Sequence, residues 1–104
     1  MRALRIKALE EMLDANPKDP FALYGLALEH KADGKFEEAL SLLEHATALP
    51  NPEVYAFYQH GEVLMALGES EDAVEILELG IERARTQGHM KALRELQELR
   101  DTLD

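Results

Sequence analysis

Two stretches of the chain have similar sequences when they are aligned at a fixed offset. In this alignment Gly34 matches Gly68. LALEHKADGKFEEAL covers residues 26–40, and HGEVLMALGESEDAV covers residues 60–74. Small and large apolar residues recur at matching places in the two stretches. Internal similarity at a period of this size, within the range of about 20–50 residues, predicts a few equivalent units stacked side by side.

Apolar residues recur at three- and four-residue spacing almost throughout, which predicts an all-α chain. We expect Gly34, Gly68 and Gly88 to end helices, because the left-handed conformation at a helix end favours glycine. The predicted helices cover residues 2–15, 20–33, 36–49, 52–67, 70–86 and 89–103. Six helices with short connections predict antiparallel hairpins.

Two of these helices are predicted to start in the same way. Asp19 is a good N-cap and Pro20 suits the first helical turn. Asn51 followed by Pro52 has the same character. We therefore expect a capped helix start at Pro20 and another at Pro52.

Small residues at matched positions predict close contacts between helices. Ala27 and its counterpart Gly61 are expected to pack against Ala39 and Ala73, respectively. Gly80 occupies a further small position, where the next hairpin is expected to approach. A hairpin of this kind cannot bury its apolar faces alone, so it needs neighbours.

With these features the chain resembles the tetratricopeptide-repeat family, whose repeat is a 34-residue helix–turn–helix. Residues 20–53 resemble one full repeat, residues 54–87 a second, residues 2–17 an N-terminal half-repeat, and residues 89–103 a C-terminal capping helix. The matching signature positions are Leu23, Leu26, Ala27, Ala39, Leu43 and Ala46 in the first repeat and Phe57, Gly61, Leu64, Ala73, Leu77 and Gly80 in the second. The resemblance implies an all-α solenoid that forms a single domain over residues 1–104.

Three residues depart from the family pattern. His30 and His60 stand where the family usually has a large apolar or aromatic residue. Arg85 stands where a proline normally ends the repeat, so the helix that starts at residue 70 is expected to continue past this point.

The resemblance also implies a concave groove, lined by the first helix of each hairpin, that binds a peptide segment of a partner protein. The positions carried over from the family are Phe21, Tyr24, Leu28, Lys31, Tyr55, Tyr58, Glu62 and Met65, with His89 and Leu96 at the far edge. All three tyrosines of the chain are among them. Tyrosine suits a binding surface, because it offers a large area and a polar tip at little cost in rotamer entropy. The alternative is that Tyr24 and Tyr58 serve local packing.

Charge limits the class of partner. The net charge is −10 at pH 7, and residues 36–82 contain eleven acidic residues and no lysine or arginine. Nucleic-acid binding requires basic residues that neutralise phosphates, so a nucleic-acid partner is not expected. The acidic segment is either a solvated surface or a patch that attracts a basic partner.

Signatures of catalysis are missing from the sequence. The chain has no cysteine and no glycine-rich phosphate loop, and Ser41 and Ser70 lie outside any nucleophile motif. Its four histidines show no i+3 or i+4 pairing that would suggest a metal site. We therefore expect a protein that is not an enzyme and uses no metal or cofactor.

The apolar runs are too short to cross a bilayer, and the first residues lack the apolar core of a signal peptide. A cytoplasmic protein without a membrane partner is expected.

One alternative function stays open: a self-associating structural unit. Arg2 and Arg5, beside the apolar stripe of Ile6, Leu9 and Leu13, leave a homo-oligomer possible.

Overall fold

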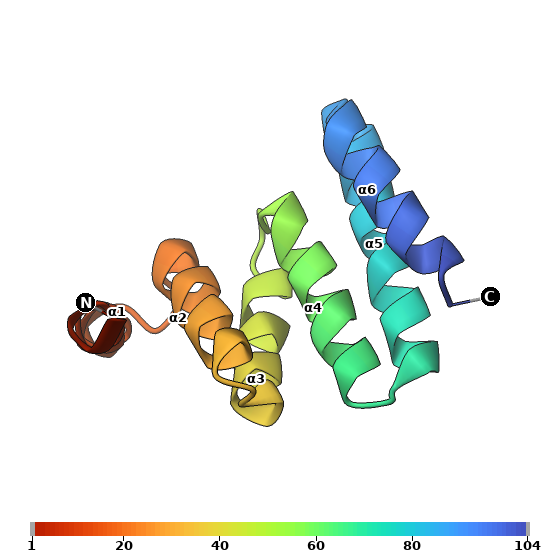
Figure 1. Cartoon of the computed structure of the whole chain (residues 1–104). Coiled ribbons are helices and arrows are strands. Elements are labelled where there is room, and N and C mark those ends of the chain that lie inside the picture. Colours follow the sequence, from red (N-terminus) through yellow and green to blue (C-terminus); the bar gives the residue numbers. More distant parts are fainter. Residues whose placement is uncertain (1, 104) are drawn as a thin grey trace. The chain divides into compact units, whose positions relative to one another are not determined.

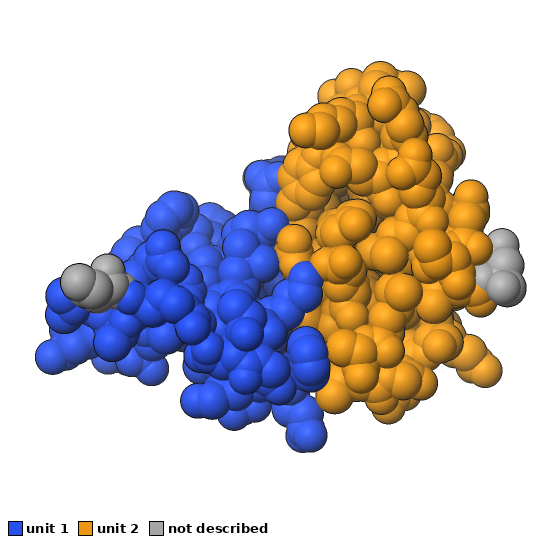
Figure 2. Space-filling model, viewed as in Figure 1, with its two compact units in different colours: residues 1–53 blue, residues 54–104 orange. Residues whose placement is uncertain are grey.

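The computed structural model describes residues 2–103 and contains six helices and no strand within that range. In chain order these are α1 (Arg2–Ala15), α2 (Pro20–Ala32), α3 (Phe36–Thr47), α4 (Val54–Ala66), α5 (Ser70–Gln87) and α6 (Met90–Asp101) (Figure 1). The all-α fold predicted from the spacing of apolar residues is confirmed. Figure 2 shows its two compact units, which meet in sequence between Glu53 and Val54.

The helices of the two units start in the register that the sequence repeat predicts. The first residues of α2 and α4 differ by the same offset as Gly34 and Gly68, and so do the first residues of α3 and α5. Gly34 and Gly68 have φ angles of 75° and 78°, a left-handed conformation that residues with a side chain rarely adopt. The residue after each glycine donates a backbone hydrogen bond of 2.8 Å to the carbonyl five positions earlier, as in a Schellman motif. The same turn therefore closes both helix pairs, α2–α3 and α4–α5.

One of the two predicted proline starts is confirmed and the other is wrong. The Asp19 side chain accepts hydrogen bonds from the backbone N–H groups of Phe21 and Ala22, at 3.0 and 3.2 Å, and α2 begins at Pro20. α4 instead begins at Val54, so Pro52 lies outside the helix. Val54 is buried and therefore starts the apolar face of α4, whereas Glu53 is exposed. Packing decides this boundary over the local proline signal.

α5 is the longest helix of the chain that the structure describes. It has 18 residues, against 12 in α3, and it ends at Gln87, before Gly88 in the left-handed conformation. The prediction that this helix runs past Arg85 is confirmed. The additional turns extend the surface on which α6 packs, and Ile81 and Ala84 belong to the same apolar cluster as Leu93 of α6.

In unit 1, α1 packs on α2, which pairs with α3. The contact between α1 and α2 is partly apolar, because Leu9 forms a buried cluster with Ala22 and Leu26. It is also ionic. Arg2 Nε lies 2.7 Å from Glu29 Oε2, and an Arg5 guanidinium nitrogen lies 2.6 Å from Glu29 Oε1.

In unit 2, α5 contacts both α4 and α6. The core of this unit is an apolar cluster that includes Phe57 of α4, Leu77 of α5 and Leu96 of α6. Gly61 lets α4 approach α5, since a Cβ atom there would come within 2.7 Å of Leu77 Cγ. The side chain that approaches Gly61 most closely is therefore Leu77, one helical turn beyond the predicted contact at Ala73.

The predicted repeat limits of 20–53 and 54–87, and the grouping of all helices into one domain, stay predictions. The domain limits at residues 1 and 104 lie outside the described residues.

Candidate functional site

The eight predicted groove positions fall on two helices, one in each unit. Phe21, Tyr24, Leu28 and Lys31 lie on α2, and Tyr55, Tyr58, Glu62 and Met65 lie on α4. None of the eight is buried in the core. Phe21 is 70% exposed, and the other seven are half-buried. Each α2 position is related to an α4 position by the offset of the sequence repeat, so Tyr24 corresponds to Tyr58.

The half-burial of Tyr55 has a specific cause in unit 2. Its hydroxyl donates a hydrogen bond of 2.5 Å to Glu95 Oε1 on α6. Its ring meets the His89 ring edge to face, with centroids 5.6 Å apart and an interplanar angle of 86°. The hydrogen bond to an ionised carboxylate and the edge-to-face ring contact both restrict the side chain. Tyr55 is therefore held in one orientation between α4 and α6.

His89 also holds the start of α6. Its Nδ1 accepts a hydrogen bond of 3.3 Å from the Ala92 backbone N–H, so the side chain is the N-cap of this helix. A ring whose Nδ1 accepts carries its proton on Nε2 when it is neutral. The same residue thus caps α6 and packs against Tyr55, which ties the helix start to the tyrosine.

Tyr58, one turn after Tyr55 on α4, lies in an acidic environment. Partial burial raises the pKa of its hydroxyl, and the negative charges of Glu62, Glu95 and Glu98 raise that pKa further. These carboxylates come from α4 and α6, so both helices contribute charge near the tyrosine. We call the surface formed by Tyr55, Tyr58, Glu62, Glu95 and Glu98 the tyrosine face.

One predicted edge residue is wrong. Leu96 has no exposed surface and belongs to the apolar cluster of unit 2. α6 turns its apolar side, with Leu93 and Leu96, toward the core, and Glu95 and Glu98 therefore lie outside it. His89, the other predicted edge residue, is half-buried and contacts Tyr55.

Sequence reasoning did not find the part played by Glu95 and Glu98. Tyr55 on α4 and Glu95 on α6 are not related by the offset of the sequence repeat, so the internal similarity does not connect them. A usable signal was present nevertheless. Glu95 and Glu98 share one side of a helix whose apolar residues point the other way.

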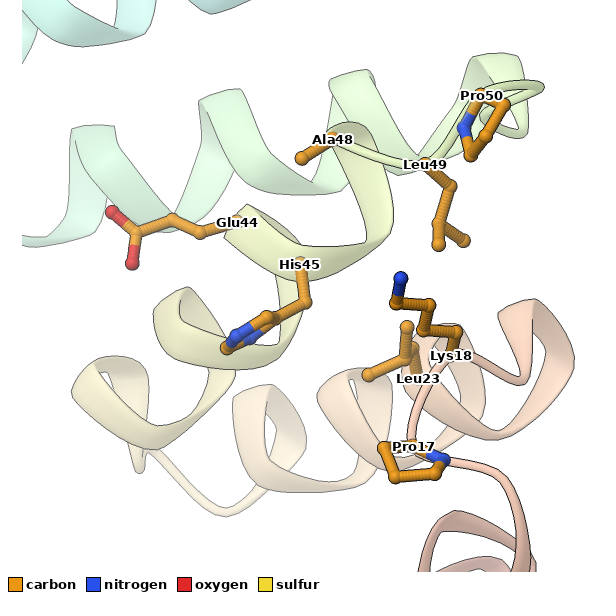
Figure 3. A pocket seen from close by; sticks show the side chains of 8 residues that line it. All are labelled: Pro17, Lys18, Leu23, Glu44, His45, Ala48, Leu49 and Pro50. Atoms are coloured by element: carbon orange, nitrogen blue, oxygen red, sulfur yellow. The ribbon is translucent and has the colours of Figure 1, made fainter.

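Unit 1 contains a pocket of about 380 Å³ that was not predicted. It lies between the start of α2 and the end of α3 and is lined by Pro17, Lys18, Leu23, Glu44, His45, Ala48, Leu49 and Pro50 (Figure 3). The lining is mainly apolar. Its charged side chains have opposite signs, so charge complementarity selects no ligand for this pocket.

Two other kinds of site are absent from the part of the chain that the structure describes. Residues 2–103 contain no group of three or more histidine, aspartate or glutamate side chains arranged to hold a metal ion. None of the helices in that range combines the length and hydropathy needed to cross a membrane.

Two helix pairs in the same register, each closed by the same glycine turn, define an all-α helical-repeat protein of the α-solenoid class. A family model described as tetratricopeptide repeat matches residues 30–96. The chain belongs to the tetratricopeptide-repeat family, as its spaced signature residues predicted. Repeats of this family are in general non-catalytic modules for protein–protein interaction.

Solved structures agree with this assignment. A tetratricopeptide repeat domain protein from Salinibacter ruber, solved by NMR, is 34% identical over 86% of this chain and 90% of its own, with a TM-score of 0.75. A crystal structure of a tetratricopeptide repeat domain protein from the same organism is 35% identical over 82% of this chain and 96% of its own, with a TM-score of 0.74.

The crystal structure of MamA shares the fold at 18% identity, with a TM-score of 0.70 over 95% of this chain and 66% of that one. No curated protein matches the chain significantly.

Proposed function

We propose that the chain binds a peptide segment of a partner protein through the eight residues Phe21, Tyr24, Leu28, Lys31, Tyr55, Tyr58, Glu62 and Met65. The main observation behind the proposal is that Tyr55 is both held in place and partly exposed. Contacts with Glu95 and His89 hold it between two helices, yet part of its surface stays open to solvent. Such a side chain offers a contact surface whose rotamer is already fixed.

Preorganisation of this kind favours binding, because an immobile aromatic side chain has little conformational entropy left to lose. Tyr58 adds a second ring one turn away on α4, also half-buried. The corresponding positions on α2, Phe21 and Tyr24, carry aromatic rings as well. The proposed contacts therefore include aromatic rings in each repeat.

The charge pattern supports a protein partner over a nucleic acid. Residues 36–82 contain no lysine or arginine, and Glu62 lies among the proposed contacts. A phosphate backbone would be repelled at that position. We also propose a cytoplasmic setting, where peptide segments of other proteins are available.

Selection from a display library of random peptides tests this function. Wild-type protein should enrich a set of related peptides, and the double variant Tyr24→Ala/Tyr58→Ala, with helicity verified by circular dichroism, should not capture them. Leu79→Ala is the matched control, because Leu79 is an exposed apolar residue on α5. Equal capture by wild type and the double variant would refute the proposed contacts.

The alternative is self-association through the first helix. In the structure, the residues suggested for that contact pack within the chain. Arg2 and Arg5 form ion pairs with Glu29 inside the chain. Leu9 is buried on α2, with Ile6 and Leu13 packed partly against the same cluster. We therefore propose a monomeric binding module, whose melting temperature does not depend on protein concentration. A melting temperature that rises with concentration would favour the oligomer.

A further inference from the structure

Two carboxylates of the tyrosine face, those of Glu95 and Glu98, are not neutralised by an ion pair within residues 2–103. Tyr58 lies within the electrostatic influence of Glu62, Glu95 and Glu98. Across residues 2–103, neither Glu95 nor Glu98 forms an ion pair with a lysine or arginine. The Tyr55 hydroxyl hydrogen-bonds to Glu95 but brings no positive charge.

Two arginines of unit 2 pair with carboxylates outside the tyrosine face. Arg100 pairs with Asp101 at 3.3 Å and reaches Glu78 at 4.0 Å. Arg85 pairs with Glu82 on its own helix. Lys91 stands one helical turn before Glu95, and Arg94 one turn before Glu98, but neither pair forms an ion pair. The carboxylates of Glu95 and Glu98 therefore lie near Tyr55 and Tyr58 without an ion-pair partner on this chain.

A lysine or arginine side chain complements such a surface in two ways. Its cationic group is attracted to carboxylates and to the face of a tyrosine ring, and the ring interaction operates within about 6 Å of the ring centroid. Its aliphatic stem can lie along the ring while the charged end stays near water. An acidic or phosphorylated segment would instead meet like charge, which disfavours it.

We infer that the partner segment docks a lysine or arginine side chain onto the tyrosine face, flanked by apolar residues that contact the neighbouring aromatic positions. This inference rests on the proposed function, since it names the chemistry of the peptide that the same residues bind. It is specific to unit 2, because the matching positions on α2 have Leu28 and Lys31 in place of Glu62 and Met65.

The peptides enriched in the library selection provide the probe. They should contain lysine or arginine at one shared position more often than the input library does. A synthetic copy in which that residue is replaced by norleucine keeps the stem and loses the charge. We expect it to bind at least about threefold more weakly in a fluorescence-anisotropy titration. Binding of the charged peptide should also weaken as the salt concentration rises from about 50 to about 500 mM, as expected for partly exposed charges.

Glu98→Gln tests the receptor side of the same contact. Glu98 is exposed and its substitution removes one charge from the tyrosine face without disturbing the core. The variant should lose affinity for the charged peptide and not for the norleucine peptide. Glu75→Gln is the matched control, because Glu75 is an exposed glutamate on α5 and its loss changes the net charge equally.

Each result separates this inference from the function on which it rests. Enriched peptides that need Tyr58 but lack a shared basic residue would overturn the inference and leave peptide binding intact. Equal effects of Glu98→Gln and Glu75→Gln would also overturn it, because they would reduce the role of charge to a general attraction. A selection that enriches no tyrosine-dependent peptide would contradict the proposed function, and this inference with it.

Discussion

Gly80 of α5 lies so close to Phe57 of α4 that a Cβ atom at Gly80 would come within 2.6 Å of the Phe57 Cβ atom. The same Cβ atom would lie 3.1 Å from a methyl group of Leu96 on α6. One small residue therefore allows three helices of unit 2 to meet. The approach also positions α4 beside α6, where Tyr55 reaches Glu95.

Gly80→Ala is expected to destabilise the protein. Alanine has the better helix propensity, by roughly 1 kcal/mol. Overpacking costs about 1–3 kcal/mol, and Phe57 Cβ cannot swing away because it is attached directly to the backbone. We expect the overpacking to prevail, with a net loss of about 1 kcal/mol in the free energy of unfolding measured in urea.

Gly25→Ala is the matched control for that substitution. Gly25 also lies inside a helix, but a Cβ atom there would meet the methyl groups of Leu9 at 3.2 and 3.4 Å. These methyl groups are the end of a flexible side chain and can shift. The unfolding free energy should equal the wild-type value or exceed it by up to about 1 kcal/mol, because the gain in helix propensity is kept. A Gly80→Ala variant as stable as Gly25→Ala would contradict the packing described for unit 2.

Glu29→Gln should loosen the attachment of α1. Glu29 is only 9% exposed and forms ion pairs with Arg2 and Arg5. The hydrogen bond from Arg2 is the main cause of the lowered pKa of Glu29. The amide cannot pair with both guanidinium groups, so hydrogen exchange of the α1 backbone should accelerate. Glu11→Gln, an exposed position on α1, serves as the control. Unchanged exchange in Glu29→Gln would show that the apolar contacts alone hold α1.

His60 should make the stability depend on pH. It is 5% exposed, and burial lowers its pKa from 6.5 to about 4. Between these values the unfolded state binds the proton and the folded state does not, so the free energy of unfolding falls as the pH falls. From pH 7 to pH 5 we expect a loss of roughly 1–2 kcal/mol in urea titrations.

His60→Leu should remove most of that dependence. Glu29 and Asp33 also have shifted pKa values, but both are lowered below the ordinary carboxyl values of 4.5 and 3.8, so their effect falls in a more acidic range. The interval from pH 7 to pH 5 therefore isolates the histidine. The same slope in wild type and His60→Leu would assign the dependence to other groups.

The ring of Tyr58 should matter more for binding than its hydroxyl. Tyr58→Phe keeps the aromatic surface and should stay within about threefold of the wild-type affinity for a selected peptide. Tyr58→Ala should weaken binding at least about tenfold, as expected for an aromatic residue at the centre of an interface. Equal losses in the two variants would make the hydroxyl the main contact.

Features that repeat along the chain were predictable from the sequence. The turns at Gly34 and Gly68 and the starts of α2 and α5 follow from local rules and the offset of the sequence repeat. The start of α4 was not predictable in this way. Pro52 gives a local start signal, but α4 begins at the buried Val54. Local chemistry therefore places most helix ends, and packing corrects them.

The sequence predicted the α4 part of the candidate site but not the α6 part. The proposed positions on α4 follow from the family resemblance, and the structure shows that Tyr55 and Tyr58 are half-buried. Their partners on α6 depend on how that helix packs, and Leu96 was assigned to the groove when it belongs to the core. The ion pairs of Glu29 with Arg2 and Arg5 likewise join distant parts of the sequence. Neither contact between helices follows from the repeat offset, although the spacing of Glu95 and Glu98 within α6 places both on its polar side.

The central claim is the proposal that a partner peptide contacts the tyrosine face and the α2 positions Phe21, Tyr24, Leu28 and Lys31. Mapping of backbone amide chemical shifts during titration with a selected peptide tests it most directly. We predict that the largest changes occur at Tyr55, Tyr58 and Glu62 on α4, near Glu95 and Glu98 on α6, and around Tyr24 on α2. Changes confined to α3 and α5, with α4 and α6 unaffected, would contradict the account.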